Sequence, residues 1–253
     1  MQQNQCPAES PVLTGLTIRI VHDNCPFDDR LRMAWGFAAT VTGPERTVLL
    51  DTGSEGALLL ENMASMGIDP KGIDSVVLSH SHADHMGGLV GFLEVNPAVE
   101  VVLLESFPVR FKETVRGRGA RVVEVESPRT ICAHVHSTGR MGRRIHEQAL
   151  VVRTEKGLVV LTGCAHPGAD KIVEQVRALH KGDIVLVMGG FHLGWATDSR
   201  IERVIRTFKQ LGVRYVAPTH CTGEKAQDLF AKHFGDRCLR VGVGKTITLA
   251  DLK

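Results

Sequence analysis

One short segment of the chain, Ser79–Gly88, gathers three histidines and an aspartate. Imidazole nitrogens and carboxylate oxygens are the ligands that a borderline cation such as Zn²⁺ prefers. The spacing predicts that His80 and His82 bind one metal ion and that Asp84 and His85 bind a second one. A polar loop that is merely rich in histidine is the alternative, but metal binding is favoured where such a pattern lies between a strand and a helix.

The elements on either side of this segment must direct its side chains toward one point. The apolar run over residues 73–78 predicts a buried strand, and residues 87–93 predict a helix that opens at two glycines. Side chains at a strand end and in the first turn of a helix can converge, whereas those within one strand alternate. We therefore place the cluster on a strand-to-helix turn.

Further stretches place the same residue types directly after an expected strand. These are Asp51 after 47–50, Cys164 and His166 after 157–162, His192 after 183–188 and His220 after 214–218. Such corners predict that residues far apart in sequence meet in one metal site. The alternatives are a turn or helix-capping aspartate for Asp51, an inert core thiol for Cys164 and a histidine satisfied beside its glycine turn for His192. Cys221 is interpreted as structural.

Strands and helices follow one another in two halves of the chain. Further strands are expected over 16–22, 34–41, 99–104, 121–125 and 148–154, and helices over 57–66, 107–115, 169–179 and 201–211, the last capped by Asp198 or Ser199. If residues 131–136 form a strand, His134 and His136 lie on one face of it. The pattern predicts an α/β protein, a four-layered αβ/βα sandwich, with the site where the strand ends of both sheets meet.

The composition is that of an ordinary globular protein, with 43% hydrophobic and 23% charged residues. Because no linker or repeat is visible, we expect one domain over residues 1–253, with 1–14 as a candidate disordered tail. A formal net charge of +2 is too small to indicate nucleic-acid binding. No signal peptide or membrane-spanning run is visible, and six cysteines without a Cys-x-x-Cys pair indicate reduced thiols and a cytoplasmic location.

Basic residues concentrate at Arg140, Arg143 and Arg144. One interpretation is a solvated surface, which is what most charge runs form. The other is a rim that binds the phosphate or carboxylate of a small-molecule substrate, because arginine presents a bidentate fork to such anions. The oligomeric state stays open.

These motifs resemble the signature of the metallo-β-lactamase superfamily, over residues from about 18 to about 249. The stretches Leu161–Gly168, Gly189–Leu193 and Pro218–Gly223 are similar to one branch of it, which contains archaeal dihydropterin-ribofuranosylaminobenzene phosphate synthases and bacterial relatives. The resemblance implies the metallo-β-lactamase sandwich. It also implies two divalent metal ions, for which zinc is expected and iron or manganese are alternatives.

The resemblance implies a role for several residues. It makes Asp51 the carboxylate that orients ligands, His220 the last metal histidine, and Asp84 both a ligand and the group that orients the nucleophile. Cys164 stands where many members carry a metal-bridging aspartate, and the resemblance leaves open which of Cys164, His166 and His136 supplies the remaining ligands. His192 is a candidate for proton transfer or substrate contact. Relatives usually carry histidine at the position of Trp35, so the chain departs from the pattern there.

A paired metal site that makes a bound water acidic predicts a hydrolase. The expected substrate is a small, phosphorylated or anionic molecule. One alternative is a pterin-type synthase, which joins a dihydropterin diphosphate to an aminobenzene riboside phosphate, and another is a catalytically silent metal-binding regulatory protein. A redox di-iron protein of the flavodiiron kind is disfavoured, because that branch generally has glutamate at the position of His82.

Overall fold

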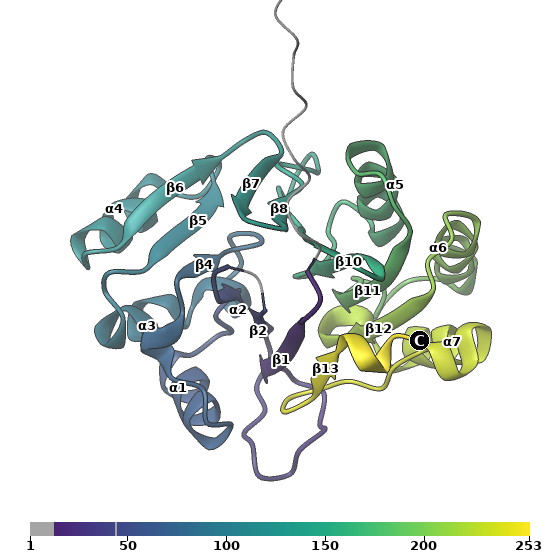
Figure 1. The fold of residues 1–253 in the computed structure, drawn as a ribbon, viewed down its shortest axis with the longest axis horizontal. Helices are drawn as coiled ribbons and strands as arrows, with labels where there is room; N and C mark the ends of the chain where they lie inside the picture. Colours follow the sequence, from purple (N-terminus) through teal and green to yellow (C-terminus); the bar gives the residue numbers. More distant parts are fainter. Residues whose placement is uncertain (1–12, 44) are drawn as a thin grey trace, which may run out of the picture.

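Two β-sheets pack face to face in this protein, and helices cover the outer side of each (Figure 1). The structure is a computed structural model that describes residues 13–43 and 45–253. The tail expected over residues 1–14 therefore lies almost entirely outside the described residues. Within them, the two sheets with their helices form the αβ/βα sandwich that the sequence predicts, and the predicted fold class is confirmed.

The first sheet carries seven strands, in which antiparallel pairing around β1 gives way to parallel pairing from β3 to β6. In spatial order they are β13 (Thr246–Thr248), β1 (Thr17–His22), β2 (Ala38–Thr42), β3 (Val48–Leu50), β4 (Ser75–Val77), β5 (Glu100–Leu104) and β6 (Arg121–Val125). The helices beside this sheet are α1 (Gly56–Ser65), α2 (Ala83–Met86), α3 (Leu89–Val95) and α4 (Val109–Gly117).

The second sheet carries six strands, and β10, β11 and β12 pair in parallel. In spatial order they are β12 (Tyr215–Thr219), β11 (Ile184–Gly190), β10 (Gly157–Thr162), β9 (Leu150–Thr154), β8 (Val135–Ser137) and β7 (Arg129–Cys132). The helices beside this sheet are α5 (Ala169–Leu179), α6 (Asp198–Gln210) and α7 (Glu224–Phe234).

Apolar packing holds the layers together in two buried clusters. The larger cluster joins residues of both sheets, such as Val76 of β4 and Leu161 of β10. The smaller one lies between the second sheet and its helices, where the rings of Phe191, Phe208 and Phe230 pack 5.3 to 5.8 Å apart between centroids. Burial of such large side chains is the main favourable contribution to folding.

Strand register brings the predicted site residues to one margin of the molecule. Leu50 pairs with Val77 in the first sheet, so Asp51 and Leu78 follow at the same level. In the second sheet, Thr162 pairs with Gly189 and Gly190 pairs with Thr219, so His220 lies beside the turns that follow β10 and β11. Parallel strands that end together offer their connecting turns to a common site.

Two local predictions were wrong, and the condition set for a third was not met. The strand expected over 34–41 begins only at Ala38, because Gly36 has a φ of 136° and a Cβ there would clash with the carbonyl oxygen of Asp84. The segment 131–136 is a hairpin, because His134 has a φ of 67° between β7 and β8, so His134 and His136 share no continuous strand. The N-cap of α6 is Thr197, which accepts a hydrogen bond from the backbone amide of Arg200.

No helix among the described residues has both the length and the apolar character that a bilayer crossing requires.

The segment between β1 and β2 is held to α1 by one buried amide. The Asn62 side chain donates to the carbonyl oxygens of Val21 and Arg32 and accepts from the amide of Arg32, at 2.8 to 3.0 Å. This segment carries Asn24 and Trp35, which lie beside the site described below.

We expect Asn62→Ala to lower the free energy of unfolding by about 2 to 3 kcal/mol, because buried backbone groups would lose their partners. Urea denaturation measures this change. The matched control is Glu61→Ala on the same helix, which removes an exposed ion pair with Arg32 and is expected to cost less than about 1 kcal/mol. Equal effects of the two variants would show that Asn62 does not anchor the segment.

Candidate metal centre

Three imidazoles, of His80, His82 and His166, form the first group of candidate ligands. One ring nitrogen of each lies within 4.8 Å of the others, and the ring centroids are 4.7 to 4.8 Å apart. Among the described residues, Nε2 of His80 and Nε2 of His166 are buried without a hydrogen-bond partner. Burial lowers the pKa of His166 to about 3 and that of His80 further, with neighbouring imidazoles adding to the effect. The rings are therefore neutral, which is the form that binds a metal ion.

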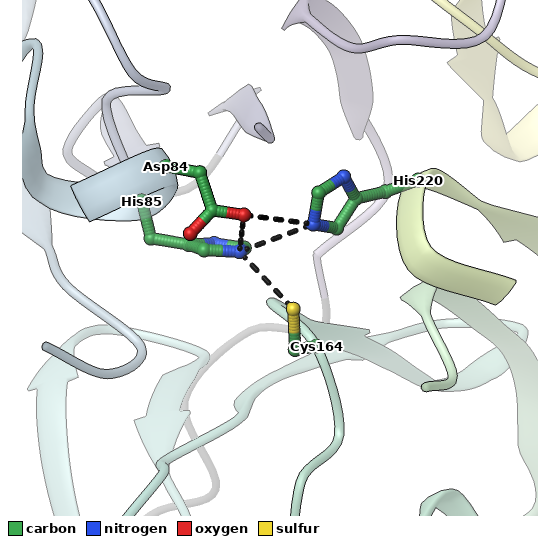
Figure 2. Close-up of side chains that lie close together, drawn as sticks. All are labelled: Asp84, His85, Cys164 and His220. Atoms are coloured by element: carbon green, nitrogen blue, oxygen red, sulfur yellow. Dashed lines mark hydrogen bonds and ion pairs between the residues drawn. The ribbon is translucent and has the colours of Figure 1, made fainter. Parts of the chain in front are cut away.

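The second group joins Asp84, His85, Cys164 and His220, as Figure 2 shows. Nε2 of His85 lies 3.2 Å from Sγ of Cys164 and 3.3 Å from Nε2 of His220. Oδ2 of Asp84 lies 3.5 Å from Nε2 of His85 and 3.4 Å from Nε2 of His220. Four ligand atoms of three chemical kinds thus face one small volume.

The two groups are neighbours, because the ring centroids of His80 and His85 are 4.2 Å apart. Burial opposes ionisation of Asp84, but the hydrogen bond with His220 and the charge of His85 outweigh it and hold the pKa of this carboxyl well below its usual range. Burial likewise opposes protonation of His85, but the Asp51 and Asp84 carboxylates raise its pKa. A divalent cation bound among these atoms would balance the negative charge of the carboxylates in place of the His85 proton.

Asp51 orients one imidazole in each of these two groups. Its Oδ1 accepts from the Ser79 amide and its Oδ2 from the Ser79 hydroxyl, each at 2.7 Å, while Nδ1 of His85 lies 2.7 Å from Oδ2. The same Ser79 hydroxyl lies 2.9 Å from Nδ1 of His80. The capping alternative does not hold, because the N-cap residue of α1 is Glu55. A carboxylate that fixes imidazole tautomers in this way is typical of metal sites.

Asn24 orients His220 in the same manner. Its Oδ1 lies 2.7 Å from Nδ1 of His220, and its amide nitrogen donates to the His220 carbonyl oxygen at 3.3 Å. His220 has a φ of 52°, so its backbone also needs an external partner. The sequence does not single out Asn24, because nothing local marks a contact with a residue so distant in the chain.

Glu147 is a further site residue that the sequence did not reveal. Its fully buried carboxylate accepts from the backbone amides of Cys164, Ala165 and His166, at 2.8 to 2.9 Å. Burial raises its pKa to about 7, although the three amides and His85 oppose that rise. Ala165 has a φ of 58°, so Glu147 holds a strained turn that carries two candidate ligands. Glu147 is one of the 28 acidic residues of the chain and lies in no recognisable motif, so the sequence did not indicate its role.

Cys221 lies closer to the site than its structural interpretation implied. Cys164, His192 and Cys221 form a third group whose ligand atoms lie within 4.8 Å of one another. Hydrogen bonds with Cys164 and with His192 lower the pKa of Cys221, although burial opposes this. His192 is exposed, and its ring centroid is 4.3 Å from that of His166.

Other predicted residues lie outside these groups. The His136 ring lies beside that of His180, with centroids 5.1 Å apart, and near the Thr130 hydroxyl. Cys164 and His166, and not His136, therefore join the candidate ligands. Arg140 is paired with Glu126. Arg143 and Arg144 are exposed and follow Gly142, where an added Cβ would lie 3.5 Å from Pro167, the residue after His166. Their role as an anion-binding rim stays a prediction.

The donor sets fit divalent metal ions. Three neutral imidazoles, and a carboxylate with two imidazoles and a thiol, are the ligand types that zinc accepts, and iron and manganese share several of them. Among the described residues, the first set contains two buried ring nitrogens without a hydrogen-bond partner, those of His80 and His166. The second set contains a close contact between the Nε2 atoms of His85 and His220. A bound cation would relieve both.

Comparisons with known proteins agree with this geometry. The family described as the metallo-beta-lactamase superfamily matches residues 36–220. The chain is 29% identical to the 7,8-dihydropterin-6-methyl-4-(beta-D-ribofuranosyl)-aminobenzene-5'-phosphate synthase of Methanocaldococcus jannaschii, over 88% of this chain and 92% of that one. The fold of the present chain resembles that of a metal-dependent hydrolase of the beta-lactamase superfamily, with a TM-score of 0.78 and 29% identity, over 92% of this chain and 98% of that one.

A more distant structure shares the fold alone. It is the metallo-beta-lactamase fold protein YhfI from Bacillus subtilis, with a TM-score of 0.70 and 13% identity, over 93% of this chain and 99% of that one.

We expect the purified protein to contain about two divalent metal ions per chain, one for each of the first two ligand groups. His82→Ala should lower the content to about one or less, because it removes a ligand of the first group. Elemental analysis by mass spectrometry measures this. The matched control is His136→Ala, which removes an imidazole outside the groups and should leave the content unchanged. Absence of metal from the unmodified protein, purified without chelator, would contradict the assignment.

Glu147→Gln should weaken metal binding by about ten- to a hundredfold, because its amide group would face backbone N–H donors and release the turn that carries Cys164 and His166. The free energy of unfolding should fall by about 2 to 3 kcal/mol. Competition with a chelating dye measures the first effect and urea denaturation the second. Glu126→Gln, at an exposed ion pair, is the control and should change neither appreciably.

Proposed function

The chain belongs to the metallo-β-lactamase superfamily, and we propose that it is a dinuclear metal-dependent hydrolase of a small anionic molecule. One observation carries the proposal: two complete groups of candidate ligands lie side by side, with the rings of His80 and His85 4.2 Å apart. Hydrolytic enzymes commonly place two ions next to each other to act on one substrate. The structural resemblance to a metal-dependent hydrolase supports the same activity.

Two divalent ions, when bound, would supply Lewis acidity and a water acidic enough to serve as nucleophile near neutral pH. The protein's own residues position the reaction. Asp84 is partly exposed and is held ionised between His85 and His220, so it can orient the nucleophile. The exposed His192, beside His166, can donate a proton to the leaving group.

The anionic substrate is inferred from two arginines. Arg143 and Arg144 are exposed and follow Gly142, where an added Cβ would lie 3.5 Å from Pro167, so the chain that carries them passes close to the residue after His166. Arg140 of the predicted rim is engaged with Glu126 and contributes less. Arginine binds phosphate and carboxylate groups through paired N–H donors.

A second candidate function is a pterin-type synthase, joining a dihydropterin diphosphate to an aminobenzene riboside phosphate. The observation that favours it is the 29% identity to the archaeal synthase over nearly the full length of both chains. The two functions differ in the acceptor, which is water in one and an organic molecule in the other. A silent regulatory protein is less well supported, because it would be expected to lack a ligand and both groups are complete among the described residues.

The test is hydrolysis of a panel of small phosphate esters and diphosphates by the metal-loaded protein in water enriched in ¹⁸O. We expect label in the released phosphate, loss of activity with a chelator and recovery with added metal. His85→Ala should lower kcat/KM at least about a hundredfold, because it breaks the second ligand group. His136→Ala should stay within about threefold.

Equal losses in the two variants, or activity that survives metal removal, would contradict the proposal. In a separate reaction, the protein is given the dihydropterin diphosphate and the aminobenzene riboside phosphate together. A joined product detected by mass spectrometry, without ¹⁸O in the released diphosphate, would favour the synthase instead.

A further inference from the structure

Both tryptophans of the chain are exposed, and both line the same pocket. The sequence contains two tryptophans, and Trp35 is 51% and Trp195 85% exposed. A large aromatic side chain is usually mostly buried, since burial of its surface contributes strongly to stability. Two such rings left in solvent at one place indicate a contact that the isolated chain does not provide.

The pocket adjoins the metal centre. Its volume is about 500 Å³, and its lining includes His220 and Cys221 together with both tryptophans. The ring of Trp35 lies 4.9 Å from that of His220, tilted by 51°. Volumes of a few hundred Å³, with aromatic walls and a few polar groups, are typical of small-molecule sites. The polar groups here are Asn24, Glu224 and Gln227.

The backbone beside Trp35 is fixed to a candidate ligand. The next residue, Gly36, has a φ of 136° and leaves no room for a Cβ against the carbonyl oxygen of Asp84. The Phe37 amide donates to that same oxygen at 3.3 Å. Trp35 is thereby placed by the turn that carries Asp84, so its exposure is not that of a free loop tip.

Trp195 is anchored on the other side of the pocket. The Gly194 amide donates to the carbonyl oxygen of Cys221 at 3.3 Å, and a Cβ on Gly223 would press on Gly194. The Ala196 amide closes the turn by donating to Leu193 at 2.9 Å. The residues on either side of this most exposed ring are therefore held against the turn that carries His220.

We propose that Trp35 and Trp195 bind a planar aromatic ring of the substrate, next to His220. The assignment rests on the proposed function for the reacting group and adds the class of molecule: an anionic ester or diphosphate attached to an aromatic ring. Aromatic side chains stack on planar rings with a geometry that saturated rings cannot match. Glu224 and Gln227 offer hydrogen-bonding groups to the edge of such a ring.

The experiment compares two phosphonates that cannot be hydrolysed and that carry either a planar aromatic or a saturated six-membered ring, phenylphosphonate and cyclohexylphosphonate. Isothermal titration calorimetry on the metal-loaded protein measures both affinities. We expect phenylphosphonate to bind about tenfold more tightly. Trp35→Leu and Trp195→Leu keep apolar bulk but lose the aromatic face, so each should reduce the preference to about threefold or less, with metal content unchanged.

The control variant is Phe27→Leu, which alters another exposed aromatic residue of the same segment outside this pocket and should keep the full preference. Each tryptophan variant keeps a single tryptophan, so its fluorescence reports on one wall of the pocket. The emission of that tryptophan should change when phenylphosphonate saturates the protein. Equal affinities for the two ligands, no binding of either, or an unchanged preference in both variants would overturn the inference. A clear preference for phenylphosphonate without any ester hydrolysis would instead overturn the proposed function alone.

Discussion

The buried carboxylate of Asp51 is the interaction on which the site depends. It fixes the His85 ring directly and the His80 ring through the Ser79 hydroxyl, so one side chain sets the direction of an imidazole in each of the first two ligand groups. Its own position follows from β3, which ends at Leu50 in parallel register with β4. A carboxylate without solvent contact is costly unless several donors satisfy it, and the Ser79 amide and hydroxyl provide them.

Backbone strain is concentrated at the same margin. Among the described residues, five non-glycine residues have a positive φ, and four of them are Asp51, Ala165, His192 and His220. Such conformations cost about 1 to 3 kcal/mol each and persist only where neighbouring groups hold them. Glu147 holds the turn at Ala165 and Asn24 holds His220, so the stability of the surrounding sheets maintains a geometry that the local sequence disfavours.

The sequence predicted those site residues that lie in a local motif and missed those that act through contacts with distant segments. The ligands within His80–His85 can be predicted from the sequence alone, since closely spaced ligand residues that follow an apolar run are typical of a metal site. Glu147 and Asn24 act through contacts with distant segments, and a single glutamate or asparagine has no pattern to reveal such a contact. The strand expected from residue 34 failed for a related reason, since Gly36 has a positive φ and lies against the carbonyl oxygen of Asp84, a distant contact that strand propensity does not encode.

The first two candidate ligand groups each draw on both sheets. His80 and His82 follow β4 of the first sheet, while His166 follows β10 of the second, and the group of Asp84 and His85 is likewise completed from the second sheet. The apolar core between the sheets must therefore be in place before either group exists. A cation bound to either group would link the two halves, and binding to the folded state alone adds to stability by mass action. Folding and metal binding are in this way coupled through the same contact surface between the sheets.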